Sequence, residues 1–371
     1  MQSIVQKISN IIFSFFCLIC LASCETMNQA VIPKTTDTVE VAILMPMSGP
    51  QGLIGQQYNK LIKMGIEDGI KTQFKITSYD GADESQILNA MTKIIAKNTK
   101  IILGPIYSPL TSLISEQAKR HNIILITMSN NPALADDKLF VFGHAPLKQL
   151  DRMINSLLDS DYKNFIALLP AGNHSHNMTK IIQNLTIQKN ATLVRAEYYS
   201  EAPEAIDKSV HLVSDAVDNI NEMEDNTGKP IVYIADDSKS LNLLFGSINK
   251  YNLDKKAIIA GDNRIDIEYP QAVDIIFTGS LNILTSNVPE RARELGIAHI
   301  SFMHGMAYDL GRLTAEYVGE KFSQERFLGR LNSKEVFVGI SGNISFTDSI
   351  AQRRYDIIKR EDGVYSTLKS N

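Results

Sequence analysis

The sequence has no tryptophan, and its three cysteines, Cys17, Cys20 and Cys24, all lie in the first 24 of 371 residues. The rest of the chain therefore has no disulfide framework, no cysteine-based zinc site and no cysteine nucleophile. Charge is nearly balanced, with 41 acidic against 37 basic residues and a net charge of −4. The chain as a whole thus lacks the basic surplus typical of proteins that bind nucleic acids.

Motifs that carry enzyme chemistry are missing as well. The histidines include no His-Glu-x-x-His spacing, and Gly339-Ile-Ser-Gly342 lacks the spacing of a hydrolase nucleophile elbow. The glycine-rich turn 48–55 is not followed by Gly-Lys-Ser/Thr, so it does not predict a phosphate-binding loop. Asp236-Asp237 is expected to cap a helix rather than act as an acid or base. We therefore expect a protein that is not an enzyme and has no metal site and no cofactor.

The N-terminus has the pattern of an export signal. Lys7 precedes an apolar run, 11–22, that is too short to cross a membrane and typical of a signal h-region. The run ends in Leu21-Ala-Ser-Cys24, which resembles the lipobox of bacterial lipoproteins, where the cysteine is diacylated and becomes the new N-terminus. The sequence thus predicts a signal peptide over 1–23 and lipidation of Cys24; an ordinary cleaved signal peptide or an uncleaved anchor is the alternative.

The residues after the lipobox indicate where the protein is held. Residue 25 is Glu rather than Asp. By the sorting rule of enteric lipoproteins, this indicates the outer membrane rather than the inner one. Residues 24–38 are mostly polar and predict a tether between the lipid and the body. We expect a bacterial periplasmic protein with a lipid anchor, since two or three acyl chains are enough for stable attachment.

From residue 39 onward, short apolar runs typical of strands alternate with amphipathic helical patterns, beginning with the run Val39–Pro46. Strands separated by helices predict parallel sheets with helices on both faces. Two such series predict an α/β protein of two Rossmann-like lobes. The expected lobes are 39–146 plus about 282–325, and 147–281 plus about 326–371.

Several stretches resemble the type I periplasmic binding proteins. Val41–Pro50 followed by Gly55 looks like the first strand and loop of that fold. Ile101–Pro105 with Ser108, and then Asn122–Ile126, extend the match, which covers nearly all of the chain after residue 38. The resemblance implies two lobes joined by three crossings, with a cleft at the carboxyl ends of the strands.

One branch of this superfamily is the branched-chain amino acid receptors. There, a serine like Ser108 holds the ligand carboxylate, and a small residue and a threonine after the fourth strand complete the subsite. Here Met128 replaces the small residue and Asn130 replaces the threonine. The far-lobe stretch Ala235–Ser238 has no aromatic residue, while Asp262 is available to bind an ammonium group. This branch implies an amino acid ligand and an ABC permease as partner.

The other branch is the penicillin-binding-protein activator lipoproteins, which share the lipobox. The segments that resemble them are Ser129–Ala135, Phe140–Gly143 followed by Gln149, Met306–Asp309, and Gly339–Phe346 before Arg353-Arg354. In that family the fold docks on a bifunctional peptidoglycan synthase, a penicillin-binding protein, and stimulates its cross-linking activity. This resemblance gives the leading hypothesis, a regulator of peptidoglycan synthesis. An ABC-transporter substrate-binding protein for branched-chain or other amino acids is the alternative.

Five residues are candidates for a ligand cleft: Ser48, Ser108, Ser129, Asn130 and Asp262. Each follows a predicted strand, where the cleft of this fold lies. Turns between strands and helices also favour Ser, Asn and Asp for local hydrogen bonding alone, so a purely structural role is the alternative for each of them.

Replacing the predicted lipidation site tests the anchor. We expect Cys24→Ala to move the protein from the membrane fraction to the soluble periplasmic fraction, because the thiol that carries the lipid is gone. Fractionation followed by a carbonate wash measures this. Membrane attachment that survives the substitution and the wash contradicts a lipid anchor at Cys24.

Overall fold

The computed structural model describes residues 38–158, 162–223, 228–236, 240–262 and 273–368. The predicted signal peptide and Cys24 lie outside these ranges. Within them, no helix combines the length and hydrophobicity needed to span a bilayer. The same ranges contain no cluster of three or more His, Cys, Asp or Glu side chains arranged to hold a metal ion.

The first sheet has eight strands in the order β11–β12–β13–β5–β4–β3–β1–β2. Strands β1 to β5 are parallel, as the alternation of strands and helices predicts, and β13 joins β5 in parallel. The strands are β1 (Val39–Met45), β2 (Phe74–Asp80), β3 (Ile101–Leu103), β4 (Ile124–Thr127), β5 (Leu139–Val141), β11 (Phe337–Gly339), β12 (Gly342–Thr347) and β13 (Ile350–Arg354).

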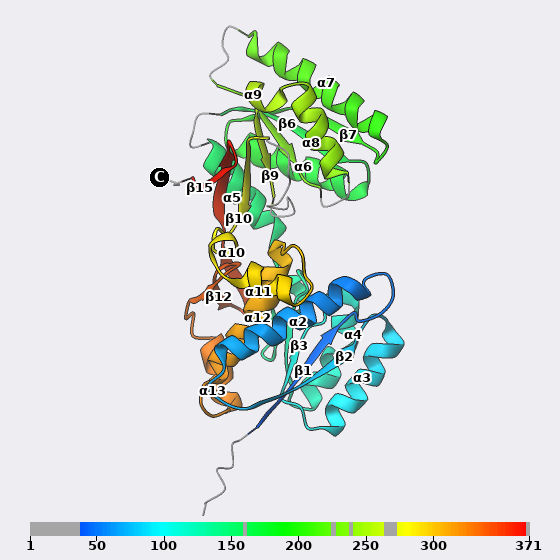
Figure 1. Ribbon diagram of the computed structural model, residues 1–371, viewed down its shortest axis with the longest axis vertical. Coiled ribbons are helices and arrows are strands. Elements are labelled where there is room, and N and C mark those ends of the chain that lie inside the picture. Colours follow the sequence, from blue (N-terminus) through cyan, green and yellow to red (C-terminus); the bar gives the residue numbers. More distant parts are fainter. Residues whose placement is uncertain (1–37, 159–161, 224–227, 237–239, 263–272, 369–371) are drawn as a thin grey trace, which may run out of the picture. The chain divides into compact units, whose positions relative to one another are not determined.

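Helices cover both faces of this sheet, so its strands are apolar on both sides. Along β1, Val41 and Ile43 pack into one core cluster, and Ala42 and Leu44 pack into the other. The first cluster contains α2 (Gly52–Gly69), α10 (Asn282–Thr285), α11 (Val288–Glu294), α12 (Phe302–Val318) and α13 (Gln324–Leu331). The second contains α3 (Glu84–Ala96) and α4 (Ser108–Arg120) (Figure 1). A short 3₁₀ helix, η1 (Pro132–Leu134), follows β4.

The second sheet has seven strands in the order β15–β14–β10–β9–β8–β6–β7. Helices α5 and α6 cover one face, and α7, α8 and α9 cover the other. Its strands are β6 (Asn164–Pro170), β7 (Thr192–Tyr199), β8 (Ile231–Ile234), β9 (Ile258–Gly261), β10 (Ile275–Gly279), β14 (Asp356–Glu361) and β15 (Val364–Thr367). Its helices are α5 (Pro146–Leu158), α6 (Asn173–Gln188), α7 (Pro203–Asn221), α8 (Leu241–Lys250) and α9 (Leu253–Lys256).

The chain passes between the two sheets three times: after β5, after β10 and between β13 and β14. The predicted fold class is therefore confirmed as two α/β lobes with mostly parallel sheets. The expected placement of the whole segment 326–371 in the second lobe needs a correction, because β11, β12 and β13 pair in the first sheet and only β14 and β15 pair in the second. Phe337 and Ile344 are buried in the first core, whereas strand alternation alone does not say which sheet a strand joins.

Helix α12 comes unusually close to α2, beside which it lies in Figure 1. A Cβ atom added to Gly65 would lie 2.0 Å from the carbonyl oxygen of Tyr308, and one added to Gly311 would lie 2.0 Å from that of Ile62. Both glycines therefore allow the two backbones to touch. The two helices are in contact because each contributes a glycine to the crossing.

A buried histidine adds a polar link between the same helices. The Nδ1 of His304 accepts a hydrogen bond from the backbone N–H of Ser301 at 3.1 Å, which caps the start of α12. The Nε2 of His304 lies 3.1 Å from the side-chain oxygen of Gln57 on α2. Burial lowers the pKa of His304 to about 4, so the imidazole is neutral at pH 7 and can accept at one nitrogen while it donates at the other.

The glycine contact predicts a large effect of a small substitution. We expect Gly311→Ala to lower the free energy of unfolding by about 2 kcal/mol or more, because the new methyl group meets the backbone of α2. Gly329→Ala is the matched control, since an added Cβ on α13 meets nothing within 4 Å; it should leave stability unchanged or raise it by about 0.4–1 kcal/mol. Equal midpoints for both variants in urea unfolding would contradict the close contact.

Candidate functional site

The structure brings together two of the five predicted cleft residues. Ser108 opens α4 directly after β3, and Ser129 follows β4, so both lie at the carboxyl ends of neighbouring strands. Their hydroxyl oxygens are 2.7 Å apart. Ser129 Oγ also accepts the backbone N–H of Asn131 at 3.1 Å. The side chain of Ser129 is buried, so its hydroxyl is held between Ser108 and the following turn.

Two threonines that the sequence analysis did not single out lie behind this pair. The hydroxyl of Thr127 donates to the carbonyl of Pro105 at 2.7 Å and accepts the N–H of Ser129 at 3.0 Å. Its oxygen is also 3.0 Å from the hydroxyl of Thr111 on α4. Both threonines are completely buried. They fix the end of β4 against α4 and thereby position Ser129.

The other predicted residues of the first lobe lie nearby in the chain but make different contacts. Ser48 follows β1, and its hydroxyl accepts a hydrogen bond from Nε2 of Gln86 on α3 at 3.1 Å. Asn130 is exposed, next to Ser129. Neither is bonded to the pair formed by Ser108 and Ser129 in the described structure, so a shared role with it stays a prediction.

Asp262 belongs to the second lobe, directly after β9. Its side chain is largely buried, with a relative exposure of 7%. Ser108 and Ser129 belong to the first lobe, and their hydrogen-bonded pair does not include Asp262. Its predicted role in binding an ammonium group stays a prediction.

The second lobe contains an aromatic and acidic pair that the sequence analysis missed. The hydroxyl of Tyr199, the last residue of β7, donates to the carboxylate of Asp236 at 2.7 Å, and Ser240 Oγ donates to the same oxygen at 2.9 Å. Tyr199 and Asp236 are buried. The stretch after β8 has no aromatic residue, as noted above, but β7 supplies one. The available signal was a tyrosine at the end of a predicted strand.

The segments that resemble the activator lipoproteins contact one another. The N–H of Gly143 donates to the carbonyl of Ser129 at 3.1 Å, and a Cβ atom on this glycine would lie 2.0 Å from that same oxygen. The guanidinium of Arg353 reaches the carbonyl of Phe142 and lies 4.9 Å above its ring and 5.8 Å from the ring of Phe302. Arg353 thus connects β13 with the end of β5 and the start of α12.

A buried carboxylate connects two further segments of that resemblance. Asp309 on α12 accepts the N–H of Ile340 at 2.9 Å and both the N–H and the hydroxyl of Ser341, at 2.7 and 2.5 Å. Burial raises the pKa of Asp309, while the hydrogen bonds from Ser341 and Ile340 act in the opposite direction. Gly339 has no Cβ atom, which would lie 2.4 Å from the carboxylate. Asp309 therefore fixes the turn between β11 and β12.

The crossing between β13 and β14 completes this set of contacts. The hydroxyl of Tyr355 accepts the N–H of Ala145 at 3.2 Å, and its carbonyl accepts Nε of Arg152 at 2.6 Å. Its ring packs against Phe302 at 5.7 Å. We call the residues Ser129, Phe142, Gly143, Phe302, Asp309, Ser341, Arg353 and Tyr355 the motif framework.

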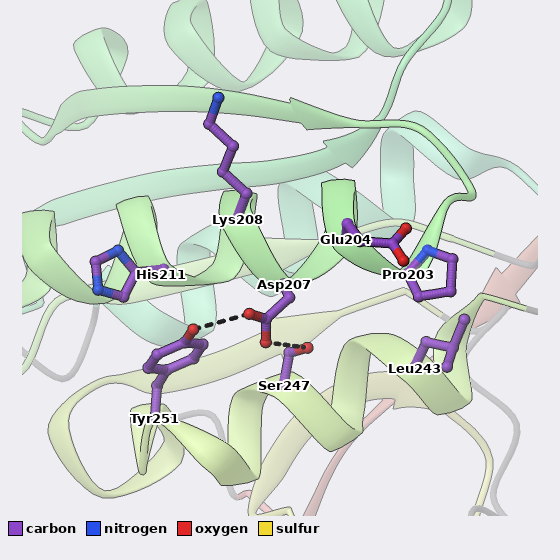
Figure 2. Close-up of a pocket in the computed structure, with 8 residues that line it drawn as sticks. All are labelled: Pro203, Glu204, Asp207, Lys208, His211, Leu243, Ser247 and Tyr251. Carbon is purple, nitrogen blue, oxygen red and sulfur yellow. Dashed lines mark hydrogen bonds between the residues drawn. The ribbon is translucent and has the colours of Figure 1, made fainter.

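Residues that the structure describes line two cavities of small-molecule size elsewhere. One, of about 530 Å³, lies between α7 and α8, where Asp207 is bonded to Tyr251 and Ser247 (Figure 2). Lys250 contacts both carboxylate oxygens at 2.8 Å and holds the pKa of Asp207 below its usual range. The other, of about 460 Å³, lies at the amino ends of β9 and β10. None of the five predicted cleft residues lines either cavity.

Two α/β lobes with three chain crossings are the architecture of the type I periplasmic binding proteins. A family model described as periplasmic binding protein matches residues 38–212. The part of the chain that this model matches is therefore similar to periplasmic binding proteins, and the whole body has the fold of solved type I structures. The similar proteins named below include binding proteins, and the match to a periplasmic binding protein model is consistent with a periplasmic location.

The chain is 56% identical over 361 residues to the uncharacterized protein RP748 of Rickettsia prowazekii (strain Madrid E), covering 96% of this chain and 97% of that one. Among solved structures, it is similar to an ABC transporter substrate-binding protein from Sphaerobacter thermophilus, with a TM-score of 0.69 and 14% identity over 90% of this chain and 97% of that one. It is also similar to full-length LpoA from Haemophilus influenzae, with a TM-score of 0.62 and 15% identity. That match covers 90% of this chain and 59% of LpoA.

The buried carboxylate of the motif framework predicts a clear loss of stability on neutralisation. We expect Asp309→Asn to lower the free energy of unfolding by about 2–4 kcal/mol, because an amide NH₂ group would face the donors of Ile340 or Ser341. Asp137→Asn is the control: it breaks an exposed ion pair with Lys119, 2.9 Å away, and should change stability little. Urea unfolding followed by circular dichroism measures both. Similar losses in the two variants would contradict the role of Asp309.

Proposed function

We propose that this protein is a lipid-anchored periplasmic regulator that docks on a peptidoglycan synthase and stimulates its cross-linking without taking part in the chemistry. The observation that carries the proposal is the motif framework. Segments that resemble the activator lipoproteins lie far apart in the sequence, yet they contact each other through Ser129, Arg353 and Asp309. They form a fixed scaffold rather than isolated motifs.

The state of the polar groups supports docking over solute capture. A receptor for a small polar solute needs a few side chains placed to bond the ligand. Here the hydroxyls of Ser108 and Ser129 bond each other, and the hydroxyl of Tyr199 bonds the carboxylate of Asp236. A solute would have to replace these bonds. Docking needs only the surface shape that the buried framework maintains.

The structural similarity to LpoA supports the proposal through the fold alone, because identity is 15%. LpoA is among the solved structures with this fold, and we take it as a member of the activator branch. The match covers 59% of LpoA, so the support concerns the binding-fold part that the two proteins share. The predicted outer-membrane anchor at Cys24 is part of the same proposal.

A substrate-binding protein for an ABC transporter is the second candidate function. It is favoured by opposite chemistry at the strand ends of the two lobes. Ser108 and Ser129 lie at the N-terminus of α4, where the helix dipole favours a carboxylate. Tyr199 and Asp236 in the second lobe suit an ammonium group. The relative from Sphaerobacter thermophilus carries that function in its name.

The leading proposal predicts binding and stimulation of a synthase. We expect residues 25–371, purified without the lipid, to capture a bifunctional penicillin-binding protein of the same cell and to increase its rate of peptide cross-linking. The reason is that docking uses the folded body, not the anchor. Pull-down and transpeptidation assays measure this, with another type I binding protein as the control. No binding and no stimulation of any such synthase would contradict the proposal.

The second candidate predicts a different outcome in a ligand screen. If the protein is a receptor for amino acids, one of them at 100 times its Kd should stabilise the fold by about 2.7 kcal/mol in a thermal shift assay. Ser129→Ala and Asp236→Asn should abolish that shift, whereas Asp207→Asn, in the cavity between α7 and α8, should keep it. The absence of any shift across a broad panel of amino acids would contradict the receptor function.

A further inference from the structure

One polar residue interrupts the apolar stripe of α5. Leu150, Met153, Ile154 and Leu157 on this helix pack into the core of the second lobe. Gln149 lies four residues before Met153 and therefore on the same face of the helix. Its side chain is only 1% exposed. Gln149 belongs to the segments that resemble the activator lipoproteins, and the motif framework gives it no role.

Strand β10 and the residue that follows it, Ser280, present two hydroxyls to the same side. Ile276 packs into the core cluster that contains α5, while Phe277 and Leu281 pack into the cluster on the opposite face. Side chains alternate along an extended chain, so Thr278 and Ser280 lie on the side of Ile276. Both are buried, with exposures of 1% and 0%.

The three polar side chains lie at the same end of the contact between α5 and β10. The helix packs against the strand. Gln149 is in the first turn of α5, just after the crossing that follows β5, and Ser280 lies at the crossing that follows β10. Leu157, at the far end of α5, lines a cavity with Ile275 and Ile276 at the start of β10. Helix and strand therefore run in opposite directions, which places Gln149 near Thr278 and Ser280.

All three side chains have an unsatisfied atom. Nε2 of Gln149, Oγ1 of Thr278 and Oγ of Ser280 have no hydrogen-bond partner within the described parts of the chain. Buried polar atoms in native proteins are almost always paired with protein or ordered water. A buried water makes about three hydrogen bonds. An amide N–H that donates and two hydroxyls that donate or accept match those needs.

We propose that ordered water occupies the contact between the first turn of α5 and the end of β10, bound by Gln149, Thr278 and Ser280. Hydrogen bonds made through an ordered water can change partners at little cost in free energy. Direct packing of side chains without water fixes one arrangement. The first turn of α5 can thus shift next to the crossings while the rest of the helix stays anchored in its apolar core. The inference concerns the crossings themselves and holds for a docking protein and for a solute receptor.

A crystal structure of residues 25–371 at about 1.8 Å resolution tests the site directly. The expected result is an ordered water within hydrogen-bonding distance of at least two of the three side chains. Direct hydrogen bonds among Gln149, Thr278 and Ser280, or a contact without water, would overturn the proposal.

The sign of a stability change provides a test in solution. Thr278→Val keeps the side-chain shape and removes the hydroxyl. If water is bound, it loses a partner and the urea midpoint falls; if the contact is dry, valine relieves a buried unpaired hydroxyl and the midpoint rises. Thr314→Val is the matched control, because the buried hydroxyl of Thr314 donates directly to the carbonyl of Leu310 at 2.7 Å. A midpoint of Thr278→Val that rises or stays unchanged would overturn the proposal.

Amide hydrogen exchange measures the mobility of the first turns of α5. Combining Gln149→Met, Thr278→Val and Ser280→Ala removes the polar groups that bind water. We expect amide hydrogen exchange in the first two turns of α5 to become slower, relative to α7 in the same protein, because the contact is then dry. Exchange in these turns that does not slow would overturn the proposed freedom of movement.

Discussion

The first lobe depends on the contact between α2 and α12. Helix α12 follows a passage of the chain through the second lobe, so nothing local in the sequence returns it to the first sheet. Gly65 and Gly311 allow the two backbones to touch, and His304 bonds across the same contact to Gln57. Close packing over a long interface then fixes the height and rotation of α12 relative to the sheet. Larger side chains at the glycines would hold the helices apart.

The position of α12 decides where Asp309 lies, and Asp309 decides where the last strands of the sheet lie. Its carboxylate takes three hydrogen bonds from Ile340 and Ser341, so it fixes the turn that joins β11 to β12. Those strands lead to β13, which carries Arg353 to Phe142. A buried carboxylate is costly unless it is fully bonded, so the turn has little freedom once α12 is in place. The motif framework is thus a consequence of helix packing.

The sequence predicted the repeated pattern of the fold well, because strands and helices differ in hydrophobic period. It also placed Ser108 and Ser129 at neighbouring strand ends, where they meet at 2.7 Å. It failed where an answer depends on a partner far away in the chain. Residues of β12 alternate between the buried face and the other face, yet only contact with the core of the first lobe assigns β11 to β13 to that sheet. Tyr199 was missed for the same reason, since its partner Asp236 follows a different strand.

The distribution of polar bonds distinguishes the two ways in which this fold is used. In a receptor, the solute supplies hydrogen-bond partners to a few polar side chains at the strand ends. In this chain, the hydroxyls of Ser108 and Ser129 form a hydrogen bond with each other in the first lobe. In the second lobe, the hydroxyl of Tyr199 donates to the carboxylate of Asp236. At these four side chains, a ligand would have to compete with bonds that already exist. A partner that binds the outer surface meets no such competition, and this difference is the physical basis of the docking proposal.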